Sequence, residues 1–488
     1  MKKQNTYLFE QLQLHHQKRP ISFHVPGHKM GKGFDPLGRE FFQDILQIDL
    51  TEVSGLDDLH QPESVILDSE KRAARVFKAK ATFFLVNGST AGNLAMILAT
   101  CKPGDKIIVQ RNVHKSVIHG LILAKTIPIY VQPEYIPSLG IWGSVSLETI
   151  EKALMDHPEA KAVLLTNPNY YGIGVDLTEI ARLVHRYRIP LLIDEAHGAH
   201  FGFHKSFPKS SIQMGADLVV QSTHKTLSAM TMGSMLHVNY DSLIDIERLK
   251  FFLSVVQTSS PSYPIMASLD LTCRLIEEKG ESLWDPVLEW LQWFDEKAST
   301  LDGIQVQHLI PSQYFTDPLK RTIQSQIPKV SGFDLQRQLE ESNIFTELAD
   351  RWNTLAIMTY GNTLGDIKAL YHSLSIIDQL YQEDLLKEGK SIPSMEFNFH
   401  QIDQEQTSTI SLDQVIYGRK KVVPLKASVG MIAAEMVIPY PPGIPLIQLG
   451  ERITKGMVSY LLELKEMGSK FQGVVDPTIS TINVVDVS

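Results

Sequence analysis

Cysteine is scarce in this chain, because only Cys101 and Cys273 occur among its 488 residues. The two form no Cys-x-x-Cys pair and have no metal-ligand spacing, so the sequence predicts neither a disulfide framework nor a bound metal. We therefore expect a reducing, cytoplasmic location. Residues 1–17 contain no apolar signal core, and no run of about 20 apolar residues occurs, so neither export nor a membrane span is expected.

Acidic residues outnumber basic residues: the chain has 55 Asp and Glu and 46 Lys and Arg, for a formal net charge of -9. This balance disfavours a non-specific nucleic-acid binder. Internal repeats and low-complexity tracts are also absent. With 43% hydrophobic and 21% charged residues, the composition is typical of a soluble globular protein, and the length suggests two or three domains.

Short β-branched runs alternate with amphipathic segments from about residue 64 to residue 237, which predicts an α/β domain with a mostly parallel, seven-stranded sheet covered by helices. The expected strands are 82–86, 106–110, 127–131, 162–166, 190–193, 218–221 and 232–238, and the expected helices include 147–157 and 178–188. We expect an N-terminal arm over residues 1–63, a large domain over 64–300 and a smaller C-terminal α+β domain over 301–488, with a helix at 333–342 and a strand at 354–360. The polar stretch 382–409 is interpreted as an insertion or mobile connection.

Lys225 follows the expected strand 218–221, and Asp194 ends the expected strand 190–193. One large enzyme class holds pyridoxal 5'-phosphate in this way: the lysine amine forms a Schiff base with the cofactor aldehyde, and the carboxylate keeps the pyridine nitrogen protonated. The alternative is that Asp194 caps a helix and Lys225 is a solvated surface residue. Hydroxyl and imidazole groups beside the pair favour the cofactor; they belong to Ser222, Thr223, His224 and His197.

The segment 87–93 follows another expected strand and opens a helical run. Backbone N–H groups at a helix start, the helix dipole and the hydroxyls of Ser89 and Thr90 together suit a phosphate dianion. The alternative is that one of these hydroxyls is only a helix N-cap. With Lys225 and Asp194 present, we interpret the segment as the phosphate site.

His114 follows the expected strand 106–110, at the carboxyl edge where open α/β sheets bind ligands. Its imidazole could stack on the pyridine ring and handle a proton, or it could be a structural histidine. The loop 24–33, which contains His28, lacks the spacing of a nucleotide-triphosphate loop, so a substrate-side lid or an arm packing over the site is expected. The segments 258–264 and 439–445 read as a turn and a rigid pocket wall or linker, respectively.

Several motifs in the same order make the chain resemble the bacterial Orn/Lys/Arg decarboxylase family, which are pyridoxal-phosphate enzymes of the aspartate-aminotransferase fold (fold type I). The resemblance spans most of the chain. It rests on residues 24–29, 55–60, 87–90, 112–116, 194–197, 222–225 and 439–445.

The resemblance implies that Lys225 carries the cofactor, Asp194 pairs with the pyridine nitrogen and His114 stacks on the ring. It implies a phosphate site made by Ser89, Thr90, Ser222 and His224. The arm would supply active-site loops, and residues 258–260 would reach a neighbouring subunit's cofactor in a homodimer or larger assembly. The wing domain of the larger inducible members is not recognisable here, so their ring assemblies are not expected. Glu347 could face the distal cation of the substrate, or could be a helix-surface glutamate.

The expected function is pyridoxal-phosphate-dependent decarboxylation of a basic amino acid, arginine rather than lysine or ornithine, to a polyamine-pathway amine and carbon dioxide. An aminotransferase or lyase on the same fold is the first alternative, although no arginine clamp for the α-carboxylate stands beside the motifs. A catalytically silent scaffold is the second, against which the intact Lys225, Asp194 and His114 argue.

Overall fold

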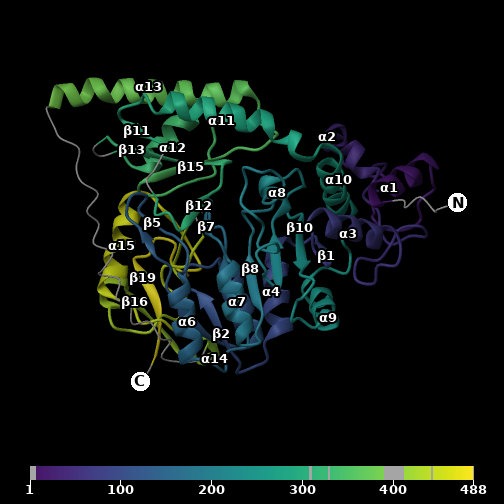
Figure 1. Cartoon of the computed structure of the whole chain (residues 1–488), viewed down its shortest axis with the longest axis horizontal. Helices are drawn as coiled ribbons and strands as arrows, with labels where there is room; N and C mark the ends of the chain where they lie inside the picture. The colour runs from purple at the N-terminus through teal and green to yellow at the C-terminus, as the bar shows by residue number, and fades with distance from the viewer. Residues whose placement is uncertain (1–6, 307–309, 328–329, 389–411, 441–442, 487–488) are drawn as a thin grey trace. The chain divides into compact units, whose positions relative to one another are not determined.

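The computed structural model describes residues 7–306, 310–327, 330–388, 412–440 and 443–486, with the side chains of residues 381–388 left aside. Its contacts divide the chain into two compact units, residues 1–101 with 177–283 and residues 102–176 with 284–488 (Figure 1). Within the described ranges, no helix is both long and apolar enough to cross a membrane.

The first unit combines four strands with helices from the N-terminal region and from the middle of the chain. Its helices are α1 (Leu8–Gln17), α2 (Pro36–Leu46), α3 (Val65–Val76), α4 (Gly88–Thr100), α7 (Thr178–Arg186), α8 (Thr223–Thr226), α9 (Ile246–Val256), α10 (Tyr263–Lys279) and the 3-10 helix η1 (Gly280–Leu283). Its strands are β1 (Ala81–Leu85), β8 (Leu191–Asp194), β9 (Leu218–Gln221) and β10 (Ser234–Val238).

These four strands lie in the order β1-β10-β9-β8. Strands β8 and β9 are parallel, and β10 runs antiparallel to both β9 and β1. It follows that β1, β8 and β9 point the same way and that their carboxyl ends share one edge. The loops after these three strands carry the residues expected to bind the cofactor.

Helix α4 packs unusually close to this sheet. A Cβ built on Gly92 would lie 2.4 Å from Val220 Cγ2 and 2.9 Å from Leu85 Cδ1. Overpacking of this kind forces neighbouring atoms to move. Glycine at this position therefore sets the distance between the start of α4 and strands β1 and β9.

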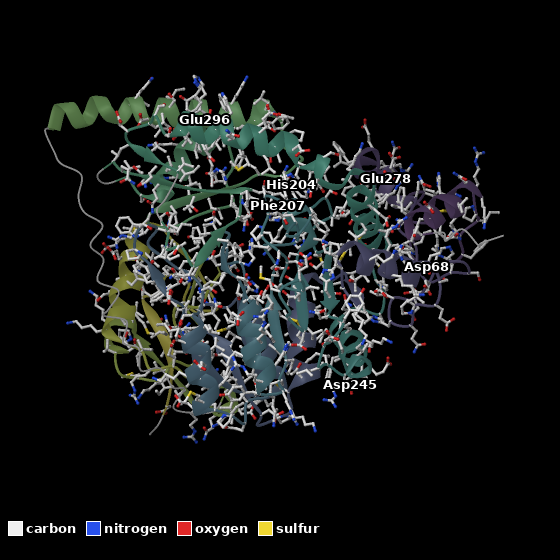
Figure 2. The ribbon with its side chains drawn as sticks, viewed as in Figure 1. Asp68, His204, Phe207, Asp245, Glu278 and Glu296 are labelled. Carbon is white, nitrogen blue, oxygen red and sulfur yellow. The ribbon has the colours of Figure 1, made fainter. Side chains whose placement is uncertain are left out.

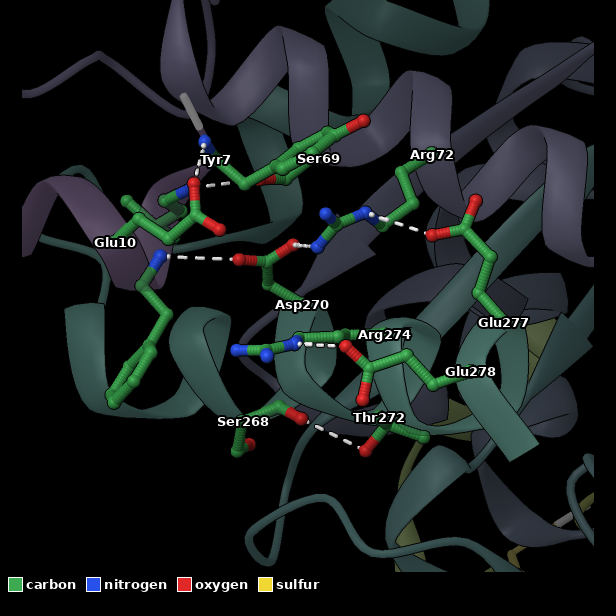
Figure 3. A network of polar contacts seen from close by, with 12 residues as sticks. Tyr7, Glu10, Ser69, Arg72, Ser268, Asp270, Thr272, Arg274, Glu277 and Glu278 are labelled. Carbon is green, nitrogen blue, oxygen red and sulfur yellow. Dashed lines mark hydrogen bonds and ion pairs between the residues drawn. The ribbon is translucent and has the colours of Figure 1, made fainter. Parts of the chain in front are cut away.

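A buried polar network fastens helix α1 to α3 and α10 (Figure 3). Arg72 Nη1 donates to Asp270 Oδ1 at 3.0 Å, and the other oxygen of Asp270 accepts from the backbone of Phe9 at 3.1 Å. The Arg72 guanidinium also lies 3.1 Å from the centroid of the Tyr7 ring. Burial of Leu8 and Leu12 against this support explains why the N-terminal region includes an ordered helix, which the sequence patterns had not predicted.

A buried aromatic contact and a helix cap add to the packing of the first unit. His204 and Phe207 lie beside each other in Figure 2, with ring centroids 5.5 Å apart. Asp245 caps helix α9 by accepting a hydrogen bond from the backbone of Arg248 at 3.1 Å. A carboxylate at this end also complements the positive pole of the helix.

The second unit holds the remaining elements. Its helices are α5 (Lys115–Ala124), α6 (Leu147–Asp156), α11 (Asp285–Ala298), α12 (Gly332–Glu341), α13 (Leu364–Glu388), α14 (Leu412–Tyr417), α15 (Lys455–Glu466) and the 3-10 helix η3 (Leu425–Ala427). Its strands are β2 (Lys106–Gln110), β3 (Ile127–Val131), β4 (Tyr135–Ile136), β5 (Ile141–Trp142), β6 (Val163–Thr166), β7 (Ile173–Val175), β11 (Ile304–Gln305), β12 (Tyr314–Thr316), β13 (Lys320–Ser325), β14 (Leu348–Ala349), β15 (Asn353–Ile357), β16 (Lys420–Pro424), β17 (Ile438–Tyr440), β18 (Lys470–Gln472) and β19 (Thr481–Val485).

Strands β6, β2 and β3 are neighbours in that order, and β2 is parallel to both of its partners. A second sheet has the order β11-β13-β15-β14, and helices α11 and α13 lie side by side next to it (Figure 1). The described residues between Leu425 and Val484 form a separate apolar core. It contains side chains of α15 together with Val437, Ile447 and Ile482.

The seven expected strands of the α/β part all form, within two residues of the predicted bounds, and so do the helices expected at 147–157, 178–188 and 333–342. The polar stretch 382–409 is partly corrected, since α13 continues through Glu388. Its remainder lies outside the described residues, as do Pro441 and Pro442 of the proline-rich turn.

Candidate active site

Four of the predicted residues follow strands whose carboxyl ends share one edge of the first unit. Asp194 is the last residue of β8, Ser222 and Lys225 follow β9, and Ser89 follows β1 in the first turn of α4. The parallel direction of these strands brings together side chains that are more than 100 positions apart in the sequence. Ligands of open α/β sheets bind at this edge.

Lys225 lies in the short helix α8, with its ammonium group against an imidazole. Its Nζ is 2.9 Å from His197 Nε2. His197 comes three residues after Asp194, in the turn that follows β8. A lysine amine held by a neighbouring imidazole is fixed in direction and has a group beside it that can accept a proton.

Asp194 is almost fully buried, with 3% of its surface exposed. One carboxylate oxygen, Oδ2, accepts from Asn93 Nδ2 at 2.8 Å, and the other, Oδ1, accepts from the backbone N–H of Ala196 at 3.1 Å. Together the two bonds fix the orientation of the carboxylate. The arrangement can therefore present a fixed negative charge to a cationic ring nitrogen.

The start of α4 has the features of a phosphate site. Ser222 Oγ donates to Ser89 Oγ at 2.8 Å, so the two hydroxyls converge from different strands. The N-cap, Asn87, makes no side-chain cap, and its Oδ1 accepts from the backbone of Thr258 at 3.2 Å. Gly88 has a φ of +74°, and an added Cβ there would meet no atom within 4 Å. Open space in front of uncapped helix N–H groups suits an anion.

His224 lies in helix α8, between Thr223 and Lys225. Its backbone N–H and its Nδ1 both lie within hydrogen-bond distance of the Gly233 carbonyl, at 3.1 and 2.9 Å. Because the carbonyl can only accept, Nδ1 carries the hydrogen. Thr90 is exposed on the first turn of α4, and its contact with a phosphate stays a prediction.

A row of buried, hydrogen-bonded polar side chains crosses the first unit from the end of β8 through β9 and β10 to β1. Glu195 accepts from Gln221 Nε2 at 2.6 Å, Gln221 Oε1 lies 3.0 Å from His237 Nε2, and His237 Nδ1 lies 2.8 Å from Thr82 Oγ1. Burial raises the pKa of Glu195 to about 7, opposed by hydrogen bonds from Ser211 and Gln221. Burial also lowers the pKa of His237 to about 3.

The residues present fit pyridoxal phosphate. The donor set comprises an amine, a buried carboxylate and a pair of hydroxyls at a helix start, which are the partners that an aldehyde, a pyridinium and a phosphate require. The buried Thr223 Oγ1, next to Ser222, has no protein partner among the described residues. A ligand that reaches this corner could satisfy it.

Three further predicted residues make their described contacts outside this cluster. His114 belongs to the second unit, where it caps α5 by accepting from the backbone of Ser116 at 3.2 Å. His28 is held in the loop of the arm, with Nε2 3.1 Å from Asp49 Oδ2 and Nδ1 accepting from Gly31 at 3.1 Å. Glu347 is exposed just before β14, on no helix. The roles of all three stay predictions, as does that of residues 258–260.

Sequence reasoning missed Asn93, Glu195 and Gln221. Asn93 could have been found, because it stands one helical turn after Ser89 and therefore shares its face of α4. Glu195 and Gln221 immediately adjoin Asp194 and Ser222, but their strand positions point to the opposite side and read as ordinary core polar residues. Of the three, Asn93 contacts a predicted residue, Asp194, whereas Glu195 and Gln221 bond to each other.

Comparisons with known proteins agree with this geometry. The family model described as Orn/Lys/Arg decarboxylase, major domain, matches residues 6–313, and the model for the C-terminal domain matches residues 395–480. An arginine decarboxylase of Bacillus subtilis is 35% identical over 492 residues, covering 99% of each chain. The uncharacterised protein YaaO of the same organism is 41% identical over 473 residues, 96% of each chain.

The fold also matches solved structures. A lysine decarboxylase from Francisella novicida superimposes with a TM-score of 0.85 at 24% identity, covering 99% of this chain and 81% of that one. The likeness confirms the expected α/β architecture with a smaller C-terminal domain.

Proposed function

Because this chain belongs to the Orn/Lys/Arg decarboxylase family, we propose that it uses pyridoxal 5'-phosphate to decarboxylate a basic amino acid, with arginine as the substrate. The observation that carries the proposal is the convergence of Lys225, Asp194 and the Ser89–Ser222 pair on one sheet edge. Arginine is favoured over lysine and ornithine because the Bacillus subtilis relative that spans nearly the whole chain is named an arginine decarboxylase.

The residues of the chain would hold the cofactor at three points. Lys225 would supply the amine for its aldehyde, Asp194 would pair with the ring nitrogen, and the start of α4 with Ser89, Thr90, Ser222 and His224 would hold the phosphate. When bound, the cofactor supplies a ring that accepts the electron pair left behind as carbon dioxide departs. Asn93 and the Ala196 N–H keep the Asp194 carboxylate fixed and charged opposite that ring.

Proton movement falls to Lys225, His197 and His114. His197, 2.9 Å from the Lys225 amine, would orient that amine and could exchange a proton with it. A proton must then be delivered to the substrate Cα, and we assign this step to Lys225 or to His114 stacked on the ring. No arginine clamp holds the substrate carboxylate in this proposal, which leaves the carboxylate free to depart.

Assembly and location are part of the same proposal. We propose a cytoplasmic homodimer with the active site at the subunit interface, residues 258–260 reaching the partner's cofactor, and His28 and Glu347 facing the substrate. The proposed domains are residues 1–63, 64–300 and 301–488. Light scattering of the purified chain measures the mass, and a monomer that retains full activity would contradict an interface site.

The deciding experiment compares wild type, Lys225→Ala and Lys250→Ala as a matched control with an exposed lysine of the same unit. Carbon dioxide and amine are measured from arginine, lysine and ornithine with added cofactor. We expect wild type and Lys250→Ala to act on arginine and Lys225→Ala to lose all turnover, because only Lys225 can bind the aldehyde. Borohydride reduction should attach the cofactor to the peptide that contains Lys225, as read by mass spectrometry. Amino transfer to a keto acid without carbon dioxide would contradict the proposal.

A further inference from the structure

We propose that Arg111 and Glu451 form a positioning clamp through which the C-terminal segment 445–451 fixes the loop that carries His114. The inference deepens the proposed function and rests on it for the role of His114. All the residues involved lie within the second unit. Arg111 directly follows β2, and His114 comes three residues later as the N-cap of α5.

The Arg111 guanidinium is bound on every side by the C-terminal segment. Its Nη2 lies 2.9 Å and 2.8 Å from the two carboxylate oxygens of Glu451, and its Nε lies 3.2 Å from Oε1. Nη1 donates to the Pro445 carbonyl at 2.9 Å and Nη2 to the Leu446 carbonyl at 3.1 Å. Arg111 and Glu451 are only 8% and 7% exposed. A fork-shaped cation with such partners has one orientation available to it.

The backbone of Arg111 is held as firmly as its side chain. Its N–H donates to the Val131 carbonyl at 2.9 Å, and its carbonyl accepts from Gln448 Nε2 at 3.1 Å. Gln448 is itself tied to the clamp, since its backbone N–H donates to Glu451 Oε2 at 2.8 Å. Arg111, which starts the His114 loop, therefore has its backbone N–H, its backbone carbonyl and its guanidinium all held in place. The C-terminal segment 445–451 holds the last two.

A second C-terminal element, strand β18, holds the far side of the loop. Lys115, immediately after His114, donates from Nζ to Gln472 Oε1 at 2.9 Å in strand β18. Between the two anchors, Asn112 Oδ1 accepts from Gln110 Nε2 at 2.6 Å and Val113 is fully buried. Val437 and Ile447 fix the clamp segment itself in the C-terminal core. The loop is short and pinned at both ends, so movement of Glu451 must be transmitted to His114.

The chain supplies a matched control for this arrangement. Arg321 makes a similar set of contacts in the same unit: two bonds to the Asp295 carboxylate, at 2.6 and 2.7 Å, and two to backbone carbonyls, both at 2.9 Å. It joins α11 to β13 and has no part in the His114 loop. Asp295→Asn therefore removes a comparable ion pair without loosening the proposed clamp.

The first test compares Glu451→Gln with Asp295→Asn as holoenzymes. We expect kcat to fall roughly ten- to hundredfold in Glu451→Gln, because small displacements of a catalytic group have effects of about this size. KM should stay within about twofold, and Asp295→Asn should keep the wild-type kcat although its Tm falls. Wild-type kcat in Glu451→Gln, or an equal loss in Asp295→Asn, would overturn the clamp.

The second test asks whether the clamp acts through His114. In a double-mutant cycle, Glu451→Gln should lower kcat little further in a His114→Ala background, because the group that it positions is already gone. If kcat of the double mutant falls by the product of the two single-mutant factors, the two residues act independently and the positioning role is rejected.

A third measurement separates this inference from the proposed reaction. The rate at which diethyl pyrocarbonate modifies His114 is read by peptide mass spectrometry, which needs no turnover. We expect the rate to change in Glu451→Gln and to match wild type in Asp295→Asn. If no substrate is decarboxylated but this pattern appears, the proposed function fails and the clamp stands. If His114 reacts alike in all three proteins, the clamp is wrong.

Discussion

Asn93 shows how a single buried amide can support a charged group. It is 1% exposed, and its Nδ2 donates to Asp194 Oδ2 at 2.8 Å. A hydrogen bond to a charged group typically contributes about 1.5–3 kcal/mol. Asn93 thus joins helix α4, the proposed phosphate site, to Asp194, the proposed partner of the cofactor ring.

Asn93→Ala should therefore weaken cofactor binding by about tenfold or more, since the Asp194 carboxylate loses one of two donors that orient it. The dissociation constant of pyridoxal phosphate can be measured by fluorescence titration of the apoprotein. Asn239→Ala is the matched control, because its Nδ2 also donates to carbonyls, those of Ile212 and Ala216, but follows β10 at the opposite edge. Equal affinities for all three proteins would contradict the supporting role of Asn93.

At the residue scale, the sequence could locate Lys225, Asp194, Ser89 and Ser222 because each stands where a strand ends. Strand direction brings such positions together without any knowledge of packing. Asn93 could not be found in that way, since its function depends on which face of α4 approaches β8. Glu347 illustrates the opposite error, because the helix proposed around it as an alternative does not form.

At the scale of the element, the strands β8, β9, β10 and β1 are joined by a hydrogen-bonded chain with a defined direction. Above its raised pKa of about 7, Glu195 is ionised and only accepts, so the amide N–H of Gln221 faces it and the amide oxygen faces His237. His237 is neutral because burial lowers its pKa to about 3. Its hydrogen therefore sits on Nε2, and Nδ1 accepts from the Thr82 hydroxyl.

Replacing Glu195 with Gln should reverse this direction. The new amide oxygen stays with the two donors of Ser211, so its NH2 faces Gln221, whose amide must turn. His237 Nε2 must then accept, and the hydrogen moves to Nδ1. Imidazole nitrogen chemical shifts of labelled protein report the tautomer. Ser211→Ala, which keeps the carboxylate, is the control; an Nε2–H tautomer in Glu195→Gln would refute the directed chain.

Element boundaries were predictable wherever periodicity and burial coincide. The expected and observed strands β2, β3 and β9 have identical bounds, because each is an apolar run between polar turns. The sequence did not predict that β10 is antiparallel to β1 and β9. The direction of a strand depends on the connection that leads into it and not on the composition of the strand. Helix α1 was missed because its apolar face is only Leu8 and Leu12, and its docking depends on Asp270, more than 250 residues away.

For the whole molecule, buried carboxyl groups in the first unit make stability depend on pH in an unusual direction. Burial raises the pKa of Glu70 from 4.5 to about 8, opposed by a hydrogen bond from the Phe84 backbone. The folded protein therefore keeps this proton across a range in which the unfolded chain releases it. The stabilising contribution is complete below about pH 4.5 and is lost as the pH rises toward 8, with Glu195 acting in the same direction up to about 7.

Glu70→Gln should remove this dependence, because an amide is neutral at every pH and can still accept from Phe84 N–H through its oxygen. The variant should match wild type near pH 4.5 and exceed it by a few kcal/mol above pH 8. Tm measured at pH 5, 7 and 9 tests this, with Glu179→Gln, an exposed glutamate of the same unit, as the control. Parallel curves for wild type and Glu70→Gln would mean that Glu70 ionises normally in the fold. A gap that opens with rising pH would instead show that burial of the Glu70 carboxyl against Phe84 of strand β1 destabilises the fold once the carboxyl ionises.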